Sequence, residues 1–224
     1  MDRAPALRRP MVTSLSLLLV VLSLVPSTGC LHLLLASSIY LWQGGHVVPA
    51  ECDALVEKRV VVVCRPPASS DFSHAGASRQ MNRAITGLLR QNVKKVEMVD
   101  PREVDTWLDE SDTGDYLDLG RAVKADIVLV VDLEHFDLYK GNTLYQGNAD
   151  VSLLVYDMEQ GGELIWDRQL GQILFPHNAP IPSADKSQDQ FQREFVGILA
   201  SRIAVYFYKH DPNAHFASDA LANR

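Results

Sequence analysis

The hydrophobic pattern is densest along residues 119–139, where a helix end leads directly into a long strand. Residues 127–131 are five consecutive apolar residues, four of them β-branched. A continuous apolar run of this kind is typical of a strand that is buried on both faces. After Asp132 apolar and polar residues alternate, as in a strand with one face nearer to solvent. We therefore place the centre of a sheet here.

Strands and helices alternate before this centre. The valines of residues 58–64, KRVVVVC, predict a buried first strand, and residues 95–99 predict a short second strand. Asp100 and Pro101 predict a helix start, with Asp100 as its cap. Apolar spacing of three to four residues predicts one helix before the second strand and two after it. Their inward residues are Met81, Ile85, Leu88 and Leu89, then Val104, Trp107 and Leu108, and finally Tyr116, Leu119, Ala122 and Val123.

The carboxyl half predicts a meander followed by a closing helix. Residues 148–158 alternate as a strand, the glycines of residues 159–163 predict a hairpin turn, and residues 164–174 return as a third antiparallel strand. Residues 174–190 predict a long exposed loop. A closing helix is indicated by Phe191, Phe195, Leu199 and Ile203, four residues apart. The expected fold is one α/β (α+β) sandwich domain with a mixed sheet and the order β-α-β-α-α-β-β-β-α.

The amino terminus has the pattern of a secretory signal. Residues 1–10 are net positive, and residues 11–25 carry no charge and are rich in Leu and Val. Small residues then lead to Cys30, and this junction resembles the lipobox of bacterial lipoproteins. The resemblance implies that residues 1–29 are removed and that Cys30 carries acyl chains such as palmitate. Ser27 departs from the lipobox pattern, which prefers Leu there.

A retained membrane segment is the competing interpretation. Residues 11–42 contain no charged side chain, and as one helix they would measure about 48 Å against a hydrocarbon core of about 30 Å. Pro26 and Gly29 interrupt this run. Residues 31–42 could lie along the bilayer with Tyr40 and Trp42 at the interface, or form a core helix of the domain. The expected organisation is signal peptide 1–29, lipid anchor and tether 30–56, globular domain 57–209 and flexible tail 210–224.

The net charge argues against a nucleic-acid partner, and the cysteines raise the question of a disulfide. The formal charge is −7 and residues 1–29 carry +2, which leaves −9 from Cys30 onward. Such a surface repels nucleic acid, so we expect no nucleic-acid partner. With Cys30 lipidated, Cys52 and Cys64 remain in an oxidising compartment, either joined by a disulfide or with Cys64 as a buried free thiol. Neither a metal site nor a cofactor is indicated by any motif.

A family resemblance rests on two stretches. Residues 119–130, LGRAVKADIVLV, and the predicted hairpin 155–166, VYDMEQGGELIW, are similar to the helix–strand and hairpin patterns of bacterial envelope lipoproteins. These include the curli secretion component CsgG, the penicillin-binding-protein activator lipoproteins and the amino-terminal domain of the Tol-system translocation protein. In physical terms, we expect the glycines to serve the turn, Trp166 to fill the core and Ala125 to let helix and strand pack closely.

The resemblance covers residues 57–208 and implies a function without catalysis. It implies a lipid-anchored domain in the periplasm of the cell envelope, with an accessory or scaffolding role through protein contacts. The strand connections are too short for the pore-forming hairpins of the curli channel, so no pore is expected. Oligomerisation stays open.

Few residues are candidates for catalysis, and we expect that the protein is not an enzyme. Asp126 and Asp132 flank the central strand and His135 follows, which would suit a periplasmic hydrolase or small-ligand binder. The simpler interpretation is that Asp126 caps a turn and His135 is half-exposed. The serine-rich residues 69–74 lack a nucleophile elbow. A single-span membrane-anchored domain of unknown activity is the remaining alternative.

The proline-bearing loop is the expected contact site for an envelope protein partner. Long exposed loops often carry binding residues. The residues that we assign to this site are Phe175, Pro176, His177, Asn178, Ile181 and Pro182.

Overall fold

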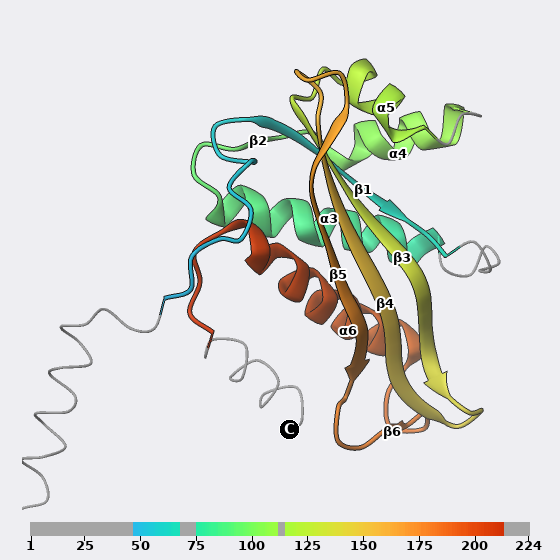
Figure 1. Ribbon diagram of the computed structural model, residues 1–224. Coiled ribbons are helices and arrows are strands. Elements are labelled where there is room, and N and C mark those ends of the chain that lie inside the picture. Colours follow the sequence, from blue (N-terminus) through green and yellow to red (C-terminus); the bar gives the residue numbers. More distant parts are fainter. Residues whose placement is uncertain (1–46, 68–74, 112–114, 213–224) are drawn as a thin grey trace, which may run out of the picture. The chain divides into compact units, whose positions relative to one another are not determined.

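One mixed sheet organises the domain (Figure 1). The computed structural model describes residues 47–67, 75–111 and 115–212. Its strand order is β2-β1-β3-β4-β5, and a further short strand, β6, pairs with β4. The strands are β1 (Arg59–Arg65), β2 (Glu97–Met98), β3 (Ile127–Lys140), β4 (Leu144–Asp157), β5 (Glu163–Phe175) and β6 (Ile181–Pro182). β1 is parallel to both β2 and β3, and β3, β4 and β5 form the predicted antiparallel meander.

The helices follow the predicted order. They are α3 (Ala75–Asn92), α4 (Pro101–Glu110), α5 (Tyr116–Ala122) and α6 (Gln188–Ala204), which continues into the short 3-10 helix η2 (Val205–Phe207). Asp100 is the cap of α4, and its carboxylate accepts a hydrogen bond from the backbone N–H of Arg102 at 2.9 Å. The predicted α/β sandwich with a mixed sheet is confirmed, and β6 is the element that the sequence did not indicate.

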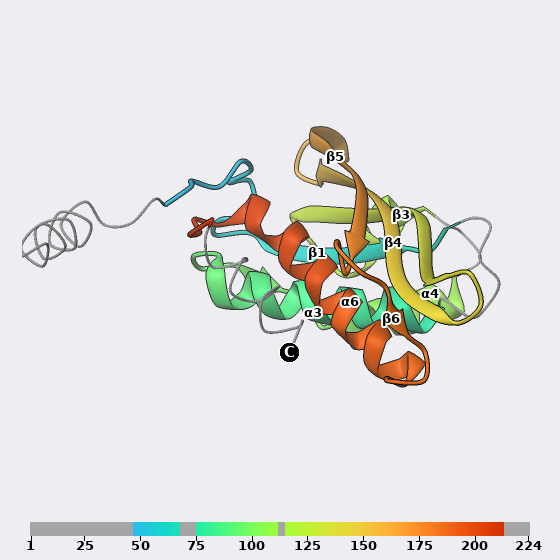
Figure 2. The same cartoon turned by 90° about the horizontal axis from the view of Figure 1, so that it is seen from below.

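The sheet has a core on each face. On one face, α3 and α6 cover the sheet, and both lie on the same side of it in Figure 2. Aromatic rings fill this main core, where Phe195 stacks on Phe136 with the ring centroids 5.5 Å apart and Phe191 stacks on Tyr145 at 4.9 Å. On the other face, α4 and α5 pack against the apolar residues of β1 and β3. Both strands are therefore buried on two faces, as their unbroken apolar runs predicted.

The turn between β4 and β5 has the predicted glycine geometry. Gly161 and Gly162 have φ angles of 77° and 88°, which favour glycine. The carboxylate of Asp157 accepts hydrogen bonds from the side chain of Gln160 at 2.7 Å and from the backbone N–H of Glu159 at 2.9 Å. These hydrogen bonds lower the pKa of Asp157, and the side-chain hydrogen bond from Gln160 contributes most. The aspartate after the strand thus fixes the turn.

The ordered domain begins before residue 57, where the sequence placed its start. Cys52 and Leu55 are buried in the main core. The backbone N–H of Cys52 donates to the carbonyl of Tyr206 at 3.0 Å, and Val48 and His210 form an antiparallel bridge. The tail predicted from residue 210 therefore begins with a paired residue. Residues 213–224 lie outside the described residues, as do residues 1–46, which hold the predicted signal peptide 1–29 and part of the predicted anchor and tether 30–56.

Trp166 and β4 also differ in detail from expectation. Trp166 is half-buried at the margin of the main core, with its ring centroid 5.5 Å from that of Phe207 in an edge-on arrangement, so it does not fill the interior. β4 begins at Leu144, four residues before the predicted start at 148. The extra residues lengthen the β3–β4 hairpin and bring Tyr145 into the core.

Candidate functional site

The acidic residues considered for catalysis lie apart. Asp126 and Asp132 are six positions apart on one extended segment, which corresponds to about 20 Å. The carboxylate of Asp126 accepts a hydrogen bond from the backbone N–H of Arg59 at 2.7 Å and so fixes the start of β1. Asp132 forms an ion pair with Arg65 at 3.1 Å. Asp126 therefore has a structural role in joining β1 to β3.

His135 is exposed on β3, opposite Asp150 of β4. A register shift separates it from Leu133, the last regularly paired residue before it. The sequence interpretation of a half-exposed histidine underestimated its exposure. Among the residues that the structure describes, no group of three or more His, Cys, Asp and Glu side chains could hold a metal ion.

The two cysteines of the domain are free and buried, which corrects the disulfide alternative. Cys52 lies before β1, where its backbone pairs with Tyr206. Cys64 lies near the carboxyl end of β1, paired in register with Val131 of β3. Burial raises the pKa of each thiol.

The predicted contact loop is divided between core and surface. Phe175 is buried, and its ring stacks on Phe191 with the centroids 6.1 Å apart. Pro176 is also buried, whereas His177, Asn178 and Pro182 are exposed. This corrects the assignment of Phe175 and Pro176 as exposed contact residues, because both belong to the interior.

The exposed part of the loop is held at both ends. The side-chain amide of Gln146 donates to the carbonyl of Pro176 at 3.1 Å. Ile181 and Pro182 form β6, which pairs with the start of β4, and the backbone N–H of Ser183 donates to the carbonyl of Thr143 at 2.9 Å. The segment expected to be a long exposed loop is therefore held on the sheet at both ends.

Helix α6 separates this loop from the amino-terminal end of the described domain. Ser187 caps the start of α6, directly after the loop. Beyond the other end of the helix, the carbonyl of Tyr206 accepts hydrogen bonds from the backbone of Glu51 and Cys52. The 17 residues of α6 span about 25 Å. Figure 1 shows β6 and the amino-terminal part of the domain at opposite ends of α6.

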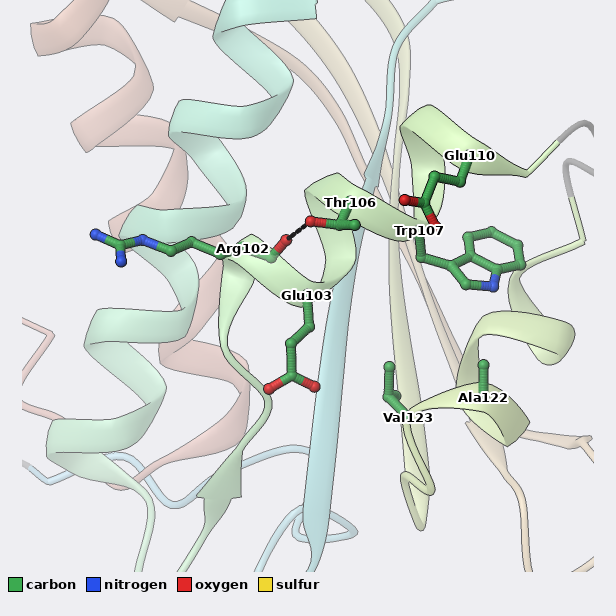
Figure 3. Close-up of a pocket in the computed structure, with 7 residues that line it drawn as sticks. All are labelled: Arg102, Glu103, Thr106, Trp107, Glu110, Ala122 and Val123. Carbon is green, nitrogen blue, oxygen red and sulfur yellow. Dashed lines mark hydrogen bonds between the residues drawn. The ribbon is translucent and has the colours of Figure 1, made fainter.

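A groove between α4 and α5 is a surface that the sequence did not reveal (Figure 3). Its volume is about 410 Å³. The groove is lined by Arg102, Glu103, Thr106, Trp107, Glu110, Ala122 and Val123. The indole of Trp107 is half-buried, and the hydroxyl of Thr106 donates to the carbonyl of Arg102 at 2.9 Å. Sequence spacing placed Trp107 on an inward stripe, and only the packing of α5 beside α4 shows that it borders a groove.

No family model and no curated protein match this chain. Solved structures with a similar fold include the PelC dodecamer from Paraburkholderia phytofirmans, with 14% identity, a TM-score of 0.46, and 73% of this chain and 96% of that chain covered. Lipoprotein GNA1162 from Neisseria meningitidis has 14% identity, a TM-score of 0.41 and coverages of 65% and 94%. The LpoB carboxy-terminal domain from Salmonella enterica has 16% identity, a TM-score of 0.36 and coverages of 55% and 87%.

Bacterial lipoproteins are thus among the structures with a similar fold. At these identities and TM-scores we carry no site, partner or activity over to this chain. Within the described ranges, no helix is both long and apolar enough to span a membrane.

Proposed function

We propose that this protein is a membrane-anchored envelope lipoprotein with a non-catalytic accessory or scaffolding role, exerted through contact with an envelope protein. Its anchor would be acylated Cys30, and its folded domain would lie in the periplasm. The amino-terminal pattern supports the anchor, since a basic segment, an uncharged apolar run and small residues precede that cysteine.

The position of the exposed loop is the observation that carries the proposed contact. His177 and Asn178 lie at one end of α6, and the chain that leads toward the anchor joins the domain at the other end. In a tethered domain with this arrangement, the loop would lie at the end of the domain opposite the point where the tether joins it. Because hydrogen bonds to β4 and its neighbours already fix the loop, binding would cost little ordering entropy.

The charge of the chain favours a basic partner. The chain from Cys30 onward carries a formal charge of −9. Complementary charge steers association and excludes partners of the same sign. We therefore propose a partner whose contacting surface is rich in Lys and Arg, with His177 and Asn178 supplying polar contacts.

The anchor is tested by the intact mass of protein extracted from membranes. The wild-type mass is expected to lack residues 1–29 and to include acyl chains, because Cys30 would be acylated before cleavage. The Cys30→Ser variant is expected to keep residues 1–29 and to gain no acyl mass. A full-length, unmodified wild-type mass would show a membrane-segment anchor and overturn the lipoprotein proposal.

The contact is tested by photo-crosslinking in the native cell. A benzophenone amino acid at position 177 is expected to give a discrete product with one protein, and the same label at exposed Gln172 of β5 serves as the matched control. The yield of this product should fall at least tenfold when the Lys and Arg residues of the partner's contacting surface are replaced. No product should form with the Cys30→Ser variant. Equal products from positions 177 and 172 would remove the loop as the contact site.

The same loop also allows a check of stability. His177→Ala combined with Asn178→Ala should change the free energy of unfolding by less than about 0.5 kcal/mol, since both side chains are exposed. Replacement of all of residues 176–182 is a poorer test, because it would also remove β6 and the hydrogen bond from Gln146.

A further inference from the structure

A pocket of about 230 Å³ lies at the carboxyl end of β1, away from both the loop and the groove. It forms because β2 pairs only with Arg59 and Val60, so β1 has no described strand partner on that side beyond Val60. Helices α3 and α4 close this edge from opposite faces of the sheet. Arg79 of α3 pairs with Asp109 of α4 at 2.5 Å and holds the two helices together.

The interior of the pocket is polar on the side of α3. Ser78, Asn82 and Thr86 lie four residues apart and are 6%, 4% and 3% exposed. Ser78 and Asn82 line the pocket. The hydroxyl of Thr86 donates to the side-chain carbonyl of Asn82 at 3.2 Å, which leaves the amide N–H groups of Asn82 for another acceptor.

The hydroxyl of Ser78 is the unusual group. Its oxygen is buried and has no hydrogen-bond partner within the described part of the chain. A buried polar atom without a partner opposes folding, and nearly all such atoms in native proteins are satisfied. Ser78 lines the pocket one helical turn before Asn82, so its hydroxyl is an unused donor beside the cavity.

The charged groups at the pocket are already balanced. Arg79 pairs with Asp109 and approaches Asp105 at 3.9 Å, and Arg83 pairs with Asp105 at 2.9 Å. Among the described residues that line the pocket, the one cation, Arg79, is already paired, and both carboxylates, Asp105 and Asp109, already have a guanidinium partner. The remaining wall includes Leu108 and the buried thiol of Cys64, whose pKa is raised by burial, so the thiol is neutral at pH 7.

We propose that this pocket binds a small uncharged molecule, of monosaccharide size, whose hydroxyl or amide oxygen accepts hydrogen bonds from Ser78 and Asn82. The volume is below the range of drug-sized sites, which begins at about 300 Å³. This activity is separate from the protein contact proposed above.

The probe is N-acetylglucosamine, which carries both hydroxyl groups and an amide, titrated calorimetrically into the full-length protein in detergent. We expect saturable binding of N-acetylglucosamine. Two charged compounds serve as comparisons, anionic gluconate and cationic glucosamine, and each should bind at least tenfold more weakly. Ser78→Ala should weaken binding at least tenfold, whereas Ser201→Ala on α6 is the matched control and should leave it unchanged.

The Tm of the Ser78→Ala variant distinguishes a role of Ser78 in binding from a role in folding. Without ligand, Ser78→Ala should leave Tm unchanged or raise it by about 2–4 °C, because it removes an unpartnered buried hydroxyl. Weaker binding together with a lower Tm would mean that Ser78 serves folding, which contradicts the proposal. Failure of N-acetylglucosamine to bind, equal binding by Ser78→Ala, or preference for a charged probe would each overturn it.

Discussion

Gly147→Ala is expected to destabilise the protein by about 1–3 kcal/mol or more. Gly147 lies on β4 under α6, and an added Cβ would be 2.6 Å from Cγ and Cδ1 of Phe195. That ring is fully buried and stacks on Phe136, Phe175 and Phe191, so it has little room to move. Chemical denaturation should show a lower midpoint with an unchanged m-value.

Two further variants test the cause. Gly197→Ala on α6 makes the same substitution where the added Cβ meets no described atom within 4 Å, so it should stabilise the helix by about 0.5–1 kcal/mol. Phe195→Leu in the Gly147→Ala background should recover part of the loss, because the shorter side chain makes room for the methyl group. Additive effects of the two substitutions would show that residues 147 and 195 do not clash.

The sequence predicted the layers because they depend on local periodicity. The apolar run of β3, the alternation of β4 and the four-residue stripe of α6 each show which face is buried. Gly147 has no side chain to show a face, and the predicted strand began one residue after it. Its contact with Phe195 depends on where α6 crosses the sheet, which is a long-range property.

The candidate sites were predictable only in part. Proline content revealed the loop, but Phe175 continues the inward alternation of Ile173 at the end of β5, a signal that would have placed it in the core. Ser78 and Asn82 each precede a core residue, Met81 and Ile85, by three positions, so helical spacing could have indicated their burial. The pocket itself depends on how early β2 ends, which no local pattern shows.

Gly120→Ala is expected to have a similarly large effect at the contact between α5 and β3, with a loss of about 1–3 kcal/mol. An added Cβ would be 2.5 Å from Cγ2 of Val128 and 3.1 Å from the sulfur of Met158. Sequence reasoning assigned this close packing to Ala125, which is also buried, but the structure assigns the tightest approach to Gly120. Gly120 in the LGRA stretch is therefore required because a larger residue would clash with Val128.

The two neighbours of Gly120 differ in how they can respond. Val128 is fully buried and β-branched, so its methyl group has no alternative rotamer of low energy, whereas Met158 is flexible and can retreat. In a thermal or denaturant melt, Val128→Ala should therefore offset part of the loss caused by Gly120→Ala, and Met158→Ala should offset less. Wild-type stability of Gly120→Ala would contradict the close approach and place α5 farther from β3. Equal rescue by both partners would show that the clash is shared between them, so that the rigidity of Val128 is not its cause.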